Sequence, residues 1–158
     1  MHERAEEFAD RARRTHDFEV EVKEFPDGTK TAADAAEAIG CDVAQIASSI
    51  AMRADDTLVV TVTSGANRVS EAKLADLLGL AETDVAMADA GEIKAALGWS
   101  IGGVPPFCHD AEVPVFLDGT LTEFETVWAA AGTPEAVFPI DPEELRALAD
   151  AEVADVAE

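Results

Sequence analysis

The chain has 158 residues, 48% of them hydrophobic, which suits one globular domain with its own core and excludes a disordered protein. It carries 33 acidic and 11 basic residues, and the formal net charge of −22 is spread over the whole length. Such a surface repels itself unless salt screens it, so the composition predicts a very salty cytoplasm and argues against a general RNA- or DNA-binding protein.

The N-terminal part of the chain predicts two helices with a strand between them. Apolar side chains at helical spacing, separated by charges, predict an amphipathic helix over residues 1–16 rather than a secretory signal. Apolar side chains then alternate over 18–25, which predicts a strand that ends at the turn 26–28. Thr31 can cap a second helix over 32–39, because its hydroxyl can accept a hydrogen bond from an amide of the first turn.

The middle of the chain predicts a β-hairpin followed by a helix. The two strands cover 49–53 and 57–63, and the second is rich in β-branched residues, as a largely buried strand is. Residues 64–67 turn the chain, and Ser70 then caps a helix over 71–78.

The C-terminal half predicts two more helices and three more strands. One helix covers 89–97, and another begins at Asp141, where an N-cap aspartate is followed by a proline and two acidic residues. We expect the last residues, 151–158, to fray. The three strands cover 113–117, 126–130 and 136–140.

The order of these elements indicates the fold class. Strands and helices interleave, but two hairpin-like pairs break a strict alternation of strand and helix. We therefore expect an α/β domain of the mixed α+β kind, in which residues 1–158 form one unit around a single central mixed β-sheet flanked by helices. No apolar run approaches the roughly 20 residues that a membrane span needs, so we expect a cytoplasmic protein with no membrane partner.

Metal and disulfide chemistry find little support in the sequence. The two cysteines, Cys41 and Cys108, cannot form a zinc site by themselves and are too few for a disulfide framework, so we expect free thiols. No clustered set of His, Cys and Asp argues for a metal or another cofactor.

The segment 102–109 is the most unusual part of the chain. Gly102 and Gly103 permit backbone angles closed to other residues and let a ligand approach the main chain. Pro105 and Pro106 then stiffen the loop, so its free amides can point in a fixed direction, as an oxyanion or carbonyl site requires. A rigid surface turn explains the same composition equally well.

Residues 98–109, which run Gly-Trp-Ser-Ile-Gly-Gly-Val-Pro-Pro-Phe-Cys-His, resemble the glycine-proline signature of the YbaK/EbsC family. Other features of that family occur around this segment in the same order, over about residues 30 to 150. They are Thr31 with its alanine-rich helix, Gln45-Ile46-Ala47-Ser48-Ser49, the strand 59–62, Ser64-Gly65-Ala66-Asn67-Arg68-Val69, Val115-Phe116-Leu117-Asp118 and Ala131-Gly132-Thr133-Pro134. One such motif would be weak support, whereas several in order are strong support.

The resemblance implies an activity and partners. Members of the family have one α/β domain and hydrolyse the ester between a small mischarged amino acid and the terminal ribose of a tRNA, in trans or as an insertion in prolyl-tRNA synthetase. The implied site has the loop 102–106 around the aminoacyl carbonyl, where it helps to align a water while a ribose hydroxyl of the substrate assists. The implied partners are the acceptor end of an aminoacyl-tRNA and an aminoacyl-tRNA synthetase, and no metal or cofactor is implied.

Ser48 departs from the family pattern. The family segment usually runs Gln-Ile-x-Lys-Ser, with a lysine held to be catalytically important, whereas Ser48 offers one weak hydroxyl. Loss of one preorganised donor typically costs about 10² to 10³ in rate. Three outcomes stay open: the site works by substrate assistance, Lys30 or Arg68 supplies the charge, or the chain is an inactive module of the same fold that docks on the tRNA acceptor end or a synthetase.

Residues near the end of the glycine-proline segment have alternative roles. Cys108 stands where the family commonly has glycine and suggests a dyad with His109, but adjacent residues on an extended loop point apart. His109 is a candidate either for contact with the substrate or for fixing the loop. Trp99 could stack on the terminal adenine, although packing in the core is the simpler expectation.

Five further residues are expected to border the site: Thr31, Ser64, Asn67, Arg68 and Asp118. Arg68 can contact a phosphate through two hydrogen bonds, or it can pair with a carboxylate of this acidic chain. Asp118 follows an apolar strand, where it can cap a turn or contact the amino group of the substrate. We expect Ser64 to be a turn residue rather than a nucleophile, because no nucleophile-elbow pattern surrounds it.

Overall fold

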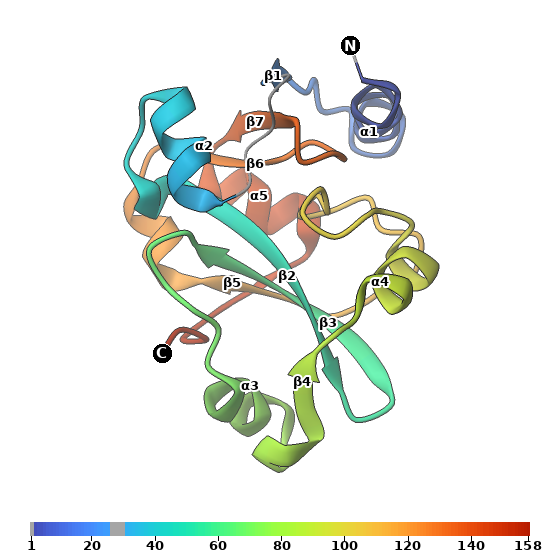
Figure 1. Cartoon of the computed structure of the whole chain (residues 1–158), viewed down its shortest axis with the longest axis vertical. Coiled ribbons are helices and arrows are strands. Elements are labelled where there is room, and N and C mark those ends of the chain that lie inside the picture. The colour runs from blue at the N-terminus through green and yellow to red at the C-terminus, as the bar shows by residue number, and fades with distance from the viewer. Residues whose placement is uncertain (1, 26–30) are drawn as a thin grey trace.

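A computed structural model describes residues 2–25 and 31–158 of the chain (Figure 1). The strands of these residues are β1 Lys23–Glu24, β2 Ile46–Ala54, β3 Thr57–Ser64, β4 Val85–Met87, β5 Val115–Asp118, β6 Val127–Ala130, β7 Ala136–Ile140 and β8 Glu152–Ala154. They form a single eight-stranded sheet in the order β1-β7-β6-β2-β3-β5-β8, with β4 paired to β2. The sheet has antiparallel and parallel pairs, which confirms the predicted mixed α/β fold.

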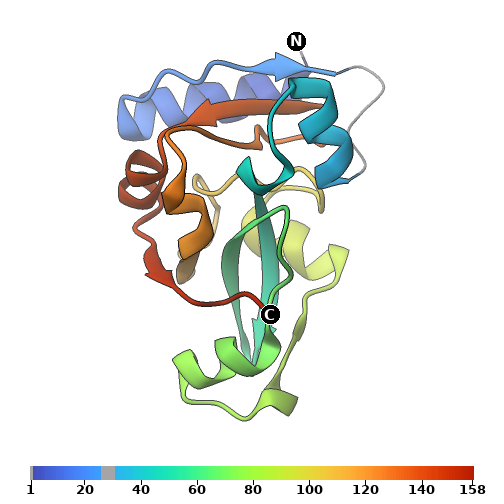
Figure 2. The ribbon, with the colours of Figure 1, turned by 90° about the vertical axis from the view of Figure 1, so that its left-hand side faces the viewer.

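The helices of the described residues are α1 Glu3–His16, α2 Ala32–Ile39, α3 Glu71–Leu78, α4 Ala90–Leu97 and α5 Pro142–Ala149. All five begin at a side chain that accepts a hydrogen bond from the first turn: His2, Thr31, Ser70, Asp89 and Asp141. Helix α1 lies beside β7 at one end of the molecule, and α3 lies at the opposite end (Figure 2). Within the described residues, none of the helices has the length and the apolar character that crossing a bilayer requires.

The hairpin of β2 and β3 is the longest feature of the sheet and runs diagonally from the middle of Figure 1 to its lower right. Its register runs from Ala47 opposite Ser64 to Ala54 opposite Thr57, so β2 begins earlier than the predicted strand 49–53. Asp55 in the turn has a φ of 57°, a left-handed conformation that aspartate tolerates better than most residues.

Strand β2 has a free stretch on the edge that faces away from β3. Strand β6 pairs only with Ile46 and Ala47, and β4 pairs only from Met52 onward. The carbonyl of Ala51 accepts a hydrogen bond from the Ala88 amide (3.1 Å) on this edge. Since main-chain groups of an antiparallel strand alternate between its two edges, those of Ser49 face the same opening. The sheet is therefore interrupted beside residues 48–51, between β6 and β4.

Aromatic side chains form the centre of the core beneath α1. Trp99 is 0% exposed, and its indole nitrogen donates a hydrogen bond to the Cys108 carbonyl (2.9 Å). The rings of Phe8 and Trp99 meet edge to face at 6.1 Å, and the Arg4 guanidinium lies 4.2 Å from the Trp99 ring centroid. Trp99 is thus a core residue and is closed to a stacked base.

Two sequence predictions of local structure are wrong, each because of a distant partner. The predicted strand 18–25 pairs with β7 only at β1, because continuing the register would place Glu21 opposite Pro139, which has no N–H to donate. The turn predicted at 26–28 lies outside the described residues. The C-terminal tail 151–158, expected to fray, instead pairs through β8 with β5 and buries Val156.

Candidate functional site

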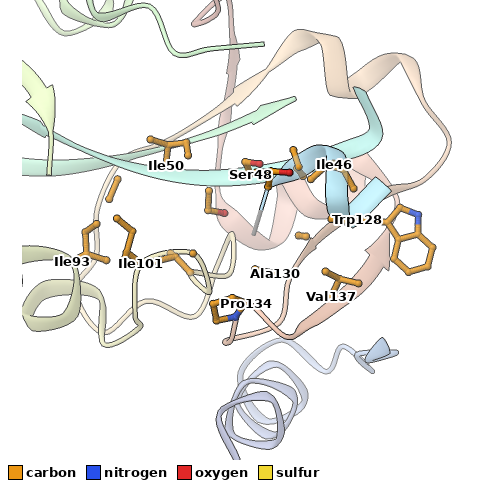
Figure 3. A pocket seen from close by; sticks show the side chains of 18 of the residues that line it. Ile46, Ser48, Ile50, Ile93, Ile101, Trp128, Ala130, Pro134 and Val137 are labelled. Atoms are coloured by element: carbon orange, nitrogen blue, oxygen red, sulfur yellow. The ribbon is translucent and has the colours of Figure 1, made fainter. Parts of the chain in front are cut away.

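A cleft of about 280 Å³ occupies the interruption of the sheet beside β2 (Figure 3). Ser48 and Ile50 of β2 form one wall, and Ile101 and Pro134 lie across from them (Figure 3). The described residues that line the cleft include no charged side chain. They are mostly alanines and branched aliphatic residues: Ala32, Ala35, Ile46, Ala47, Ile50, Ala51, Ala88, Ile93, Ile101, Val104, Ala129, Ala130, Ala136 and Val137.

Ser49 adds an unsatisfied polar group to this apolar wall. Its hydroxyl is buried and has no hydrogen-bond partner among the described residues. A buried polar group without a partner costs about 1–3 kcal/mol, so such groups are rare unless a water or a ligand satisfies them. On the β2 side the cleft has the Ser48 hydroxyl and the main-chain groups of this free edge as polar groups, with the buried Ser49 hydroxyl close by.

The glycines of the loop 98–109 have two different functions. Gly102 is exposed at the cleft with a φ of 86°, and a Cβ there would lie 3.4 Å from Cγ of Pro134. Gly103 packs against the main chain of Thr133, where a Cβ would lie 2.6 Å from Cα. The amide of Gly103 donates to the Ser100 carbonyl (3.0 Å), so it is not free for a ligand. Gly102 and Val104 line the cleft, and no hydrogen bond from the described residues engages their amides.

His109 braces the loop from behind. Its Nε2 donates to the Pro105 carbonyl (2.7 Å), since a carbonyl oxygen can only accept. Burial lowers the pKa of His109, and the Arg11 charge acts in the same direction against the opposing effects of the Pro105 hydrogen bond and Asp110. The ring is therefore neutral and fixed. Pro105 and Pro106 are buried, and neither they nor His109 line the cleft.

Cys108 has a left-handed backbone with a φ of 66°, which explains why glycine suits this position. Burial raises the pKa of its thiol to about 11, while the Arg11 charge acts weakly in the opposite direction. A nucleophilic cysteine needs the opposite shift, because the thiolate is the reactive form.

We expect alkylation of Cys108 by iodoacetamide to be about 100-fold slower at neutral pH than that of a free thiol, since a pKa of about 11 instead of 9.0 leaves about 100-fold less thiolate. The measurement uses a Cys41→Ser background, so that only one thiol reacts. For the deacylation that the family resemblance implies, Cys108→Ala should be as active as the wild type, and a loss of activity in that variant would support a Cys108–His109 dyad.

Asp118 organises the polar end of β3 and β5. Its carboxylate accepts hydrogen bonds from the Ser64 amide (3.0 Å), the Asn67 side chain (2.9 Å) and the Thr120 amide (3.0 Å). Burial would raise the pKa of this carboxyl, but the hydrogen bonds from Asn67, Thr120 and Ser64 outweigh it and hold the pKa below its usual value. Asp118 thus fixes the turn after β3 from a buried position.

A second cleft of about 390 Å³ adjoins the first. It is bordered by Ser64, Asn67 and Arg68, and by the apolar side chains of Met52 and Val69. The hydroxyl of Ser64 donates to the Ala44 carbonyl (2.8 Å) and accepts from the Ala66 amide (3.3 Å), as expected of a turn residue. The two clefts share Ala32, Ser48, Ile50 and Met87.

The structure divides the predicted site residues into three groups. Thr31, Ser48 and Gly102 line the first cleft, and Ser48, Ser64, Asn67 and Arg68 line the second. Gly103, Pro105, Pro106, His109 and Asp118 support these walls from behind. Lys30, a candidate source of positive charge, lies outside the described residues.

Several cleft residues escaped the sequence analysis. Met87, which lines both clefts, is 61% exposed, and Ile101, which lines the first, is 53% exposed. Such exposure is unusual for large apolar side chains. Trp128 lies at the far end of the first cleft from Ile93, with the Lys23 ammonium 5.0 Å from its ring centroid (Figure 3). Only the signature loop could have pointed to Ile101, and no local pattern marks Met87 or Trp128.

Comparison with known proteins gives consistent matches over most of the chain. The family model of the aminoacyl-tRNA editing domain matches residues 26–148. The uncharacterised protein YwhH of Bacillus subtilis is 33% identical over 130 residues, which is 80% of each chain. A solved structure described as a "putative trans-editing enzyme for prolyl tRNA synthetase" is 35% identical, with a TM-score of 0.93 over 100% of this chain and 99% of its own. A scaffold from work on epitope backbone grafting by computational design is 37% identical, with a TM-score of 0.91 and the same coverage.

Proposed function

Since the chain belongs to the aminoacyl-tRNA editing domain family, we propose that it hydrolyses the ester bond of a misacylated tRNA, in trans, to release a small amino acid. In this reaction a water attacks the ester carbonyl, and the carbon–oxygen bond to the tRNA ribose breaks. The ribose oxygen leaves with a proton, and the products are the free amino acid and an uncharged tRNA. The match to a structure described as a "putative trans-editing enzyme" supports action outside a synthetase.

The feature that carries this proposal is the exposed Gly102, which lines the apolar cleft together with Ser48. The amides of Gly102 and Val104 are free of hydrogen bonds from the described residues, so they are available to the developing oxyanion of the ester. The brace from His109 to Pro105 and the close packing of Gly103 on Thr133 hold this loop in place. Donors held rigid before the reaction stabilise the transition state without a cost for ordering them.

The lining of the cleft supports a small amino acid as the acyl group. Its alanines and branched aliphatic residues leave no charged side chain to receive a charged substrate side chain. Such a group would have to be desolvated without a partner, which is costly. The hydrolytic water and a ribose hydroxyl of the substrate would then do the proton transfer, because the described residues of this cleft include no general base.

A binding module of the same fold is the second candidate, and Ser48 is the observation that favours it. The position that the family pattern gives to lysine lines both clefts and carries only a hydroxyl. In that case the clefts would bind the acceptor end of a tRNA without cleaving the ester, or the chain would dock on an aminoacyl-tRNA synthetase.

The deciding experiment is deacylation in molar potassium chloride, with tRNAs charged with Ala, Ser, Cys, Thr or Pro. We expect one small amino acid to be released well above the spontaneous rate, because an uncharged, largely aliphatic lining suits a small neutral acyl group. Circular dichroism in the same salt confirms that the protein is folded, and the same tRNAs without protein give the background. No release from any of the tRNAs by folded protein would favour the binding module.

A further inference from the structure

We propose that the second cleft binds the terminal nucleotide of the tRNA acceptor end, with Arg68 on a phosphate and Met87 against the base. This inference rests on the proposed function, because it assumes that the first cleft receives the aminoacyl ester. It assigns binding roles to Arg68 and Met87 in the cavity next to the one in which the ester is proposed to be hydrolysed.

The continuity of the two clefts is the first argument. Ser48 and Ile50 stand on the face of β2 that both clefts share, and Ala32 and Met87 flank them. An acyl group beside Ser48 is covalently joined to a ribose, so the nucleotide must occupy space next to the first cleft. The second cleft, of about 390 Å³, is the adjoining cavity.

Arg68 supplies the second argument. The side chains of Arg4, Arg11, Arg13, Arg53 and Arg146 each form an ion pair with a carboxylate. Within the described residues Arg14 and Arg68 form none, although the chain has 33 acidic residues. Arg14 is exposed and donates to the Asp10 carbonyl (3.3 Å), whereas Arg68 lines the second cleft. An unpaired guanidinium that lines a cavity suits an anionic group with two acceptor oxygens, such as a phosphate.

Neighbouring polar groups limit how much nucleic acid this cleft can hold. The Asn67 amide nitrogen donates to Asp118 (2.9 Å) and to the Thr120 hydroxyl (3.0 Å), so its carbonyl oxygen remains to accept from a ligand. The carboxylates of Glu71 and Glu158 also line the cavity and would repel a run of phosphates. The charge pattern therefore favours one terminal nucleotide over a long stretch of RNA.

Met87 provides the apolar contact. It is 61% exposed, although it lines both clefts. A flexible thioether adapts to a flat ring and makes favourable contacts with aromatic groups. Contacts of this kind do not depend on phosphate neutralisation, whose contribution falls as salt rises, so they suit a protein of net charge −22.

The test measures binding of the trinucleotide CCA, labelled at its 5′ end, by fluorescence anisotropy in molar potassium chloride. We expect Arg68→Ala and Met87→Ala each to weaken binding by about 10-fold, the loss of one charge-assisted hydrogen bond or one stacked contact. Arg14→Ala is the charge control and Leu77→Ala the apolar control, since both are exposed and line neither cleft. Both controls should bind CCA like the wild type.

The outcomes separate this inference from the proposed function. Binding of CCA that depends on Arg68 and Met87 supports the inference, even where no charged tRNA is deacylated. Deacylation with an unchanged KM in both variants overturns the inference and leaves the hydrolytic function intact. The inference is also overturned if both variants bind CCA as tightly as the wild type, or if the wild type does not bind CCA.

Discussion

Gly102→Val is expected to lower kcat/KM for deacylation by at least about 100-fold, the usual cost of losing one oxyanion donor. Gly102 has a φ of 86°, and its Cβ would lie 3.4 Å from Cγ of Pro134. A branched side chain would therefore fill the mouth of the cleft and turn the peptide away from its present direction. Both effects act where the ester carbonyl is proposed to lie, so the loss should appear in kcat as well as in KM.

Gly79→Val is the matched control for this variant. Gly79 has a φ of 72° and ends α3, and a Cβ added there would meet no atom within 4 Å, so valine carries the same type of backbone strain far from the cleft. Each substitution should cost stability of about 1 kcal/mol or more, measured by chemical unfolding in high salt. If Gly79→Val lost activity to the same extent as Gly102→Val, strain rather than the loop would explain the loss. Unchanged activity in Gly102→Val would show that the loop 102–106 is not part of the catalytic site.

The local chemistry of the sequence was sufficient for most of the elements. Capping side chains such as Thr31 and Ser70 satisfy amides within their own first turn, so the helix starts depend on a few neighbouring residues. The β2–β3 hairpin joins consecutive segments through a short turn, and its β-branched second strand favours pairing. Such features do not require knowledge of distant partners.

The cleft could not be predicted in the same way, because it is a gap between two strands that come from far along the chain. The side chain of Gln45 donates to the Thr126 carbonyl (3.0 Å), which holds the start of β6 against β2 across 81 positions. Strand β4 has only three residues, too few for a recognisable pattern, yet it closes the other side of the gap. The signature loop could be found from its glycines and prolines, whereas Met87 and Trp128 reach the clefts through this long-range pairing.

Support residues were harder to separate from contact residues. For His109 and Asp118 the sequence left two roles open, contact with the substrate or support of the local chain, and the structure places both behind the walls, hydrogen-bonded to the protein itself. A sequence pattern records that a polar residue is needed at a position, but it does not distinguish a group that touches a ligand from one that holds the loop. The hydrogen bonds to Pro105 and Ser64 make that distinction.

The substitution Ser48→Lys is expected to raise kcat/KM for deacylation by about 10- to 100-fold. The reason is that one preorganised donor at the reacting group typically changes the rate by a factor of about 10² to 10³. Ser48 is half-buried and lines both clefts, so a longer side chain there can reach the ester and the proposed nucleotide site. Among the described residues that line the two clefts, Arg68 is the one cation, and the gain should therefore be larger in an Arg68→Ala background.

Ser48→Met is the control for this gain, since it adds similar length without charge and should not accelerate the reaction. The measurement is single-turnover deacylation in molar potassium chloride, with the amino acid identified in the panel. A gain from a measurable wild-type rate supports a slow but active hydrolase, whose charge comes in part from Arg68. A gain from a rate equal to the background would instead show that the natural chain has lost catalysis and retains only binding. If Ser48→Lys left the rate unchanged in both the wild-type and the Arg68→Ala backgrounds, the reaction would not need a cation at this wall. The ribose hydroxyl of the substrate would then be sufficient for catalysis.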